Sequence, residues 1–227
     1  MSLRRAACVH GCQAVRQTRW VDAQGGLGLV GRVDELRAVG GFLAQAIGGA
    51  GRLVVVAGEP GIGKTRLCEE ASSLAGAARE WAGWRAGSRA VGSFWAWRDL
   101  LAQMGASAGE PGAGGKPPDV ARERFFDGVA RVVRSAALER PWLLVVDDVQ
   151  WADAGTLRLL LYLAPLLRTM PVLMVAALRE GDRAAAPSST LTAGLVRHAS
   201  IVRLHGLAAG DVGHLVGQVT GARPAAG

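Results

Sequence analysis

The chain has 227 residues, half of them apolar, and its 26 basic and 19 acidic side chains leave a formal net charge of +7. This length suits one α/β domain with a substantial core and the start of a second. Its apolar stretches are too short to span a bilayer, no apolar stretch typical of a signal peptide follows Arg4 and Arg5, and three cysteines make no disulfide framework. We therefore expect a cytoplasmic protein without a membrane segment.

Residues 1–26 are predicted to form a disordered basic tail. Four arginines precede the first acidic residue, Asp22. Such a tail can contact nucleic acid or an anionic surface, or it can be a solvated extension. Cys8, His10 and Cys12 lie close together here, but a zinc site needs four ligands and no second Cys/His pair is near. We expect no metal at this position.

Alternating helices and strands are predicted after the tail. Apolar residues at helical spacing follow Val33 and end at the glycine-rich run 48–51, and the strand Leu53–Ala57 comes next. A helix from Lys64 to about Leu74 and a strand over Glu80–Ala86 follow. The remaining expected elements are a helix starting at Phe94, a loop over Gly105–Pro118, a helix over Val120–Leu138, a strand over Trp142–Val146, a helix over Ala154–Leu167, a strand over Val172–Leu178, a helix ending at His198 and a strand over Ser200–Leu204. This alternation implies parallel strand pairing.

The strand Leu53–Ala57 runs directly into a complete G-x-x-x-x-G-K-[ST] motif. A strand, a glycine-rich turn and a helix start aim successive backbone N–H groups at one point, where they can hold nucleotide phosphates. Lys64 adds a positive charge for the β- and γ-phosphates, and the Thr65 hydroxyl a ligand for Mg²⁺. The alternative is a glycine-rich surface turn. The expected nucleotide-binding residues are Gly58, Glu59, Pro60, Gly61, Ile62, Gly63, Lys64, Thr65 and the following Arg66.

Two acids, Asp147 and Asp148, follow the second strongly apolar strand. In a parallel sheet the carboxyl ends of the strands gather at one edge, where the phosphates lie. Asp147 would hold Mg²⁺ opposite Thr65, and Asp148 would orient and deprotonate the attacking water. An acidic turn that caps the next helix is the alternative, but Asp153, directly before Ala154, fits the N-cap better.

Arg179 follows the apolar strand Val172–Leu178. If this strand lies beside the phosphate-loop strand, the guanidinium would reach the γ-phosphate region and report whether it is occupied. The alternative is a surface arginine at a strand end. The candidate catalytic residues are thus Asp148, Lys64 and Arg179, and the candidate metal ligands are Thr65 and Asp147.

Together these segments resemble the AAA-like ATPase module of STAND regulators, closest to the nucleotide-binding domain of large LuxR-type transcriptional regulators. The resemblance rests on Leu29–Leu36, Gly58–Thr65, Leu143–Asp153 and Ala177–Glu180, with support from Phe94–Arg98. It extends to Val219, and its most specific part is the Asp-Asp-x-Gln-Trp-Ala-Asp run at 147–153.

The resemblance implies a fold and a set of roles. The fold is a P-loop NTPase three-layer α/β sandwich with a parallel sheet and an extra strand between the Walker A and Walker B strands. The ATPase core would cover residues 27–206 and use ATP and Mg²⁺. Arg32 would lie near the base or ribose, and Arg179 would be the sensor arginine.

In that family a helical lid, a winged helix, helical repeats and a helix-turn-helix follow the core. Here Leu207–Val212 resembles the lid entry and the chain ends at Gly227, so we expect residues 207–227 to be the start of a truncated lid. Direct DNA contact by a recognition helix is not expected. We expect ATP binding and slow Mg²⁺-dependent hydrolysis as a regulatory switch that acts on protein partners or on missing C-terminal domains. The alternatives are a non-hydrolysing, nucleotide-stabilised interaction module and a DNA-binding regulator that acts through the arginine-rich tail.

Other conspicuous side chains are expected to be structural. Trp95, Trp97, Trp142 and Trp151 are predicted to pack in the core or at an interface, and Cys68 to be a small core residue. The histidines have no evident carboxylate partner and are expected to be structural or solvent-facing; they are His198, His205 and His214.

Overall fold

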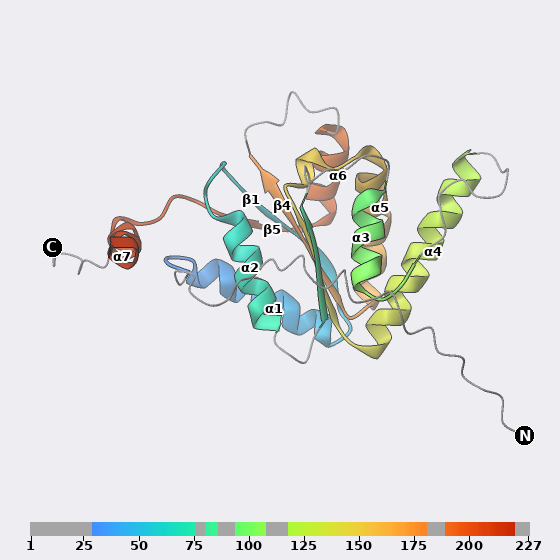
Figure 1. Cartoon of the computed structure of the whole chain (residues 1–227), viewed down its shortest axis with the longest axis horizontal. Helices are drawn as coiled ribbons and strands as arrows, with labels where there is room; N and C mark the ends of the chain where they lie inside the picture. The colour runs from blue at the N-terminus through green and yellow to red at the C-terminus, as the bar shows by residue number, and fades with distance from the viewer. Residues whose placement is uncertain (1–28, 76–79, 86–93, 108–117, 181–188, 221–227) are drawn as a thin grey trace, which may run out of the picture.

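The computed structural model describes residues 29–75, 80–85, 94–107, 118–180 and 189–220. They form a parallel five-stranded sheet between two layers of helices (Figure 1). The strand order is β2-β3-β4-β1-β5, so β4 lies between the phosphate-loop strand β1 and the Asp147 strand β3, as expected. The strands are β1 (Arg52–Gly58), β2 (Glu80–Arg85), β3 (Trp142–Asp147), β4 (Val172–Arg179) and β5 (Ser200–Arg203).

Helices cover both faces of the sheet. One face carries α1 and α2, the other carries α3 to α6, and α7 lies to one side of this sandwich (Figure 1). None of the described helices is long and apolar enough to cross a membrane. The helices are α1 (Val33–Ile47), α2 (Lys64–Ala75), α3 (Trp95–Gln103), α4 (Pro118–Glu139), α5 (Ala154–Leu166), α6 (Ser189–His198) and α7 (Ala209–Thr220), with 3-10 turns η1 (Val149–Trp151) and η2 (Leu167–Thr169).

The continuous apolar runs of the central strands follow from this layering. Successive side chains of a strand point to opposite faces. In β1, Leu53, Val55 and Ala57 belong to the core cluster under α3 to α6. Val54 and Val56 belong to the cluster under α1 and α2. Because helices cover both faces, both sets of positions must be apolar, as is typical of parallel sheets.

The predicted helices and strands are present, with ends that differ by a residue or two. Trp97, Trp142 and Cys68 are buried, and the three histidines are exposed, as predicted. The tail 1–26, with its Cys8, His10 and Cys12, lies outside the described residues. The same holds for residues 108–117 of the expected loop and for the side chain of Trp95.

Of the two positions predicted for Trp151, core or interface, the core is excluded, because its side chain is 55% exposed. It is the last residue of η1, whose other two residues, Val149 and Gln150, are buried. A 3-10 turn has three residues per turn, so neighbouring side chains point about 120° apart. With two of them directed inward, the third faces solvent.

Candidate functional site

The candidate site lies at the carboxyl edge of the sheet, where β1, β3 and β4 end. β4 pairs with β1 in the register that sets Arg179 opposite Gly58. The Glu180 N–H donates to the Gly58 carbonyl at 3.0 Å, which fixes the end of β4 to the start of the phosphate loop. β4 therefore lies beside the phosphate-loop strand, which is the condition under which Arg179 was expected to reach the γ-phosphate region.

The phosphate loop is a tight turn between β1 and α2. Gly61 and Gly63 have φ values of 76° and 102°, in the left-handed region that strains residues with a side chain. Glu59 and Pro60 form the exposed outer part of the turn. This geometry delivers the chain to the N-terminus of α2, where free N–H groups and the helix dipole favour anions.

Lys64 is buried at this turn, with 6% of its surface exposed. Its ammonium donates to the Gly58 carbonyl at 3.0 Å and to the Glu59 carbonyl at 2.7 Å. Burial lowers the pKa of Lys64 below its ordinary value, and the Arg179 cation adds to this, while Asp148, Asp147 and Glu180 act in the opposite direction. Positive charge held away from water in this way favours an anionic ligand.

Thr65 and Asp147 meet across the edge of the sheet. The Thr65 hydroxyl donates to Asp147 Oδ2 at 2.8 Å, and the N–H of Asp148 donates to Asp147 Oδ1 at 3.0 Å. Asp147 is 1% exposed. A hydroxyl and a carboxylate are the hard oxygen donors that suit Mg²⁺.

The described residues contain no group of three or more His, Cys, Asp or Glu side chains that could hold a metal ion. Nucleotide-site Mg²⁺ needs only one or two protein ligands, because phosphate oxygens and water complete its shell. The pair Thr65 and Asp147 therefore fits an ion that arrives with a nucleotide.

Asp148 and Arg179 face each other beside this pair. Arg179 Nε lies 3.4 Å from Asp148 Oδ1, and both side chains are partly exposed. Asp148 has a φ of 52°, which is uncommon for a residue with a side chain. The structure thus brings together the five predicted residues Lys64, Thr65, Asp147, Asp148 and Arg179.

Gln150 is a residue of this site that the sequence reasoning missed. Its Nε2 donates to Asp148 Oδ1 at 3.1 Å, and its Oε1 accepts from the Arg179 N–H at 3.2 Å. Gln150 belongs to the Asp-Asp-x-Gln-Trp-Ala-Asp run at 147–153, and this was the sequence feature that could have indicated a role at the site. Its contact with β4 could not be predicted from the sequence.

Arg32 lies behind the phosphate loop, with 5% of its surface exposed. Its guanidinium donates to the carbonyls of Ile62 at 3.1 Å and His205 at 2.6 Å, and to Glu35 at 3.0 Å. It therefore joins the phosphate loop to the segment after β5. It also lines a cavity of about 290 Å³ next to the loop, together with Leu29, Val30, Gly61, Ile62, Gly63, Arg66, Leu207 and Leu215.

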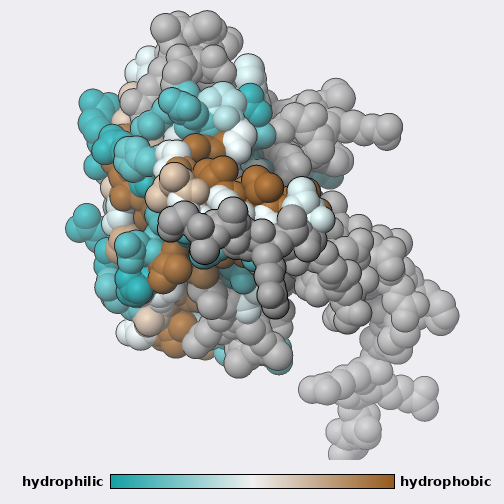
Figure 2. Space-filling view, turned by 90° about the vertical axis from the view of Figure 1, so that its left-hand side faces the viewer, coloured by the Kyte–Doolittle hydropathy of each residue, from teal (hydrophilic) through white to brown (hydrophobic). Residues whose placement is uncertain are grey.

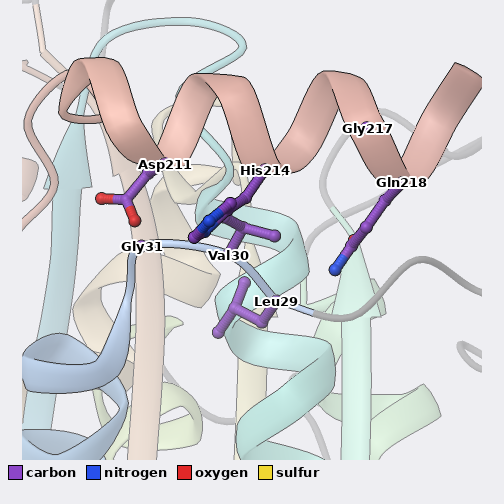
Figure 3. A pocket seen from close by; sticks show the side chains of 7 residues that line it. All are labelled: Leu29, Val30, Gly31, Asp211, His214, Gly217 and Gln218. Atoms are coloured by element: carbon purple, nitrogen blue, oxygen red, sulfur yellow. The ribbon is translucent and has the colours of Figure 1, made fainter. Parts of the chain in front are cut away.

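A second cavity, of about 480 Å³, lies between residues 29–31 and α7 (Figure 3). Asp211, His214 and Gln218, three or four residues apart and so on one face of α7, point toward this segment. Gly31 permits the approach, because a Cβ at this position would lie 2.6 Å from Asp211 Cγ.

The opposite face of α7 is apolar and exposed. Val212, Val216 and Val219 are 45%, 53% and 64% exposed, and they follow the helical spacing of one face. On the side of the molecule that carries α7, apolar side chains gather in a band (Figure 2). No residue of α7 is buried.

Comparison with known protein families agrees with this geometry. A family model for the AAA ATPase domain matches residues 28–175, more than half of the chain and all of the phosphate loop and the acidic pair. The chain belongs to this AAA ATPase family. No curated protein matches it in a sequence comparison.

Two solved structures share the fold of this AAA ATPase domain. The ORC2 protein of Aeropyrum pernix, solved in ADPNP–ADP complexes, has 18% identity and a TM-score of 0.61 over 91% of this chain and 56% of its own. The ORC1 protein of the same organism, solved in complex with DNA, has 17% identity and a TM-score of 0.54 over 91% of this chain and 52% of its own. This chain thus spans about half the length of each.

Proposed function

We propose that this AAA ATPase domain binds Mg·ATP and hydrolyses it slowly, as the nucleotide switch of a STAND regulator of the LuxR type. The observation that carries the proposal is the 2.8 Å contact between Thr65 and Asp147 beside the buried Lys64. This contact brings the phosphate loop together with a carboxylate suited to bind Mg²⁺, at one edge of the sheet. The Asp148–Arg179 ion pair lies beside Thr65 and Asp147.

ATP would lie across the phosphate loop with its nucleoside in the adjoining cavity of about 290 Å³. The loop N–H groups and Lys64 would hold the phosphates. Apolar walls from Val30, Leu207 and Leu215 suit a base, whose faces are apolar. Arg32, which holds Ile62 and the segment after β5 in place, would form the wall near the base or ribose.

Hydrolysis would proceed between the γ-phosphate and the acidic pair. Thr65 and Asp147 would hold Mg²⁺, which when bound neutralises charge on the β- and γ-phosphates. Asp148 would orient a water molecule and accept its proton as the water oxygen bonds to the γ-phosphorus and the bond to the β–γ bridging oxygen breaks. Arg179 would contact the γ-phosphate and so distinguish ATP from ADP.

The switch would act through α7. Leu215 of α7 and Leu207 before it line the same cavity as the phosphate loop. A nucleotide there therefore contacts core and α7 together, and its affinity for one arrangement of α7 would shift the population toward that arrangement. Protein partners, or domains beyond this chain, would respond to it. The STAND and LuxR assignment rests on the sequence resemblance alone.

The test is phosphate release from the purified chain with Mg·ATP. The wild type should release phosphate, whereas Lys64→Ala and Asp148→Asn should not. Arg122→Ala, on α4, serves as a control that removes a charge from the protein surface. Equal phosphate release from all four proteins would contradict the hydrolysis proposal. Binding of Mg·ATP without release from any of them would instead support a nucleotide-stabilised interaction module.

A further inference from the structure

The side-chain amide of Gln150 joins Asp148 and Arg179 through its two ends. One end donates to the Asp148 carboxylate at 3.1 Å, and the other accepts the main-chain N–H of Arg179 at 3.2 Å. The orientation of this amide is unambiguous, because a carboxylate can only accept from the NH₂ group and a main-chain N–H can only donate to the oxygen. The two contacts therefore define one bridge.

This bridge is rigid compared with the ion pair beside it. Gln150 is 7% exposed and belongs to η1, the turn directly after Asp148. The Asp148–Arg179 ion pair is partly exposed at 3.4 Å, and exposed ion pairs are weak and easily exchanged. The guanidinium of Arg179 can thus leave Asp148 while its main chain stays bound to Gln150.

We infer that Gln150 is a positioning residue for ATP hydrolysis. Its amide fixes the Asp148 carboxylate and the backbone of Arg179 relative to each other, and it leaves the Arg179 guanidinium free to exchange Asp148 for a γ-phosphate. In this role Gln150 acts through Asp148 and Arg179, the residues that its amide contacts. The inference rests on the proposed hydrolysis and gives a specific role to a residue that lies within the run at 147–153 but to which the sequence analysis assigned none.

The test compares kcat and KM for two substitutions in the full chain. Gln150→Leu removes both hydrogen bonds at similar volume. Gln150→Glu keeps an acceptor for the Arg179 N–H but sets a carboxylate against Asp148. Both should lower kcat by about 10-fold to 100-fold, the range expected when a general base is misplaced. Because Gln150→Leu leaves Lys64, the phosphate loop and the net charge of the site unchanged, its KM for ATP should stay within about twofold of the wild type.

Gln103→Leu is the matched control. Gln103 also uses both ends of its side-chain amide: it exchanges two hydrogen bonds of 3.1 Å with the main chain of Gly83, in the contact between α3 and β2, and its Nε2 also donates to Asp99 at 3.1 Å. If Gln150 contributed only to packing, Gln103→Leu and Gln150→Leu would lower the thermal stability by similar amounts and leave kcat unchanged. If Gln150→Leu does not fold, Gln150→Glu carries the test.

The outcomes separate the two proposals. Phosphate release from the wild type with unchanged kcat in the folded Gln150 variants overturns this inference and leaves the proposed hydrolysis intact. A fall in kcat for Gln150→Leu with full activity of Gln150→Glu also overturns it, since the contact with Asp148 would then be dispensable. No release from the wild type overturns the hydrolysis proposal and this inference with it.

Discussion

At the residue scale, the site is organised around a buried positive charge. Lys64 is covered by the protein and contacts main-chain carbonyls of its own loop. Arg179 adds a second cation at the same edge of the sheet, and burial together with this cation lowers the pKa of Lys64. Two cations in a partly desolvated turn favour a ligand with several negative charges close together, which is the chemistry of a polyphosphate.

We predict that Lys64→Ala weakens Mg·ATP binding by about 100-fold, because a charge-assisted contact to phosphate contributes about 1.5–3 kcal/mol. Isothermal titration calorimetry with the wild type and the variant measures this directly. Arg122→Ala should leave the affinity unchanged, since its exposed side chain pairs only with Asp119 among the described residues. Equal affinity in Lys64→Ala and the wild type would contradict phosphate binding by the loop.

Thr65→Val tests the magnesium pair. The variant keeps the shape of the side chain but loses the hydroxyl that contacts Asp147. We expect the wild type and the variant to bind nucleotide with the same affinity in the presence of EDTA. Adding Mg²⁺ should raise the affinity of the wild type only. A magnesium effect of equal size in the variant would show that Thr65 is not a metal ligand.

At the scale of elements, Asp153 connects two helices on one face of the sheet. As predicted, it is the N-cap of α5 and accepts the Thr156 N–H at 3.0 Å. The same oxygen accepts the Phe94 N–H at 3.2 Å, at the start of α3. Gly155 allows this contact, because a Cβ there would lie 2.8 Å from the Phe94 ring. The Asp-Asp-x-Gln-Trp-Ala-Asp run at 147–153 thus begins at the site and ends where α3 and α5 start.

We predict that Asp153→Ala lowers the free energy of unfolding by about 1–3 kcal/mol, the cost of losing a helix cap and leaving a second N–H without its acceptor. Urea unfolding measures the change. Asp119→Ala, which removes an acid from the first turn of α4 where its side chain is 79% exposed, should change stability far less. A similar loss in both variants would mean that Asp153 acts only through its charge.

At the scale of the whole molecule, the sandwich and α7 differ in how they are held. The sheet and α1 to α6 enclose two apolar clusters. In contrast, α7 buries no residue and meets the rest of the chain across the two cavities that share Leu29 and Val30. An element with little buried apolar surface opens at low free energy, so the position of α7 is the property that a ligand can change most easily.

We predict that Mg·ATP slows amide hydrogen exchange in α7 and raises the thermal unfolding temperature of the chain. Without nucleotide, the amides of 209–220 should exchange much faster than those of α5. With nucleotide they should slow, because Leu215 lines the cavity that would hold the nucleoside. A ligand that binds only the native state must also raise its stability. The proposed switch would be contradicted if millimolar Mg·ATP changed neither the amide exchange rates of α7 nor the unfolding temperature of the chain.

The helices and strands, and the residues that meet at the candidate site, could largely be predicted from the sequence. Apolar spacing in α1 and apolar runs in β1, β3 and β4 reflect which side chains must be buried, and that requirement is local enough to be read from neighbouring residues. The phosphate loop could likewise be recognised, because its glycines, Lys64 and Thr65 act within one turn. Asp147 followed from the rule that parallel strands end at the same edge.

Contacts between residues far apart in the chain could not be predicted from the sequence and are visible only in the folded structure. Gln150 reaches the N–H of Arg179, 29 residues away, and Arg32 reaches the carbonyl of His205, 173 residues away. Neither contact has a local pattern, because each depends on the packing of whole elements. The exposure of Trp151 also depends on packing, since the other two residues of η1, Val149 and Gln150, are directed inward.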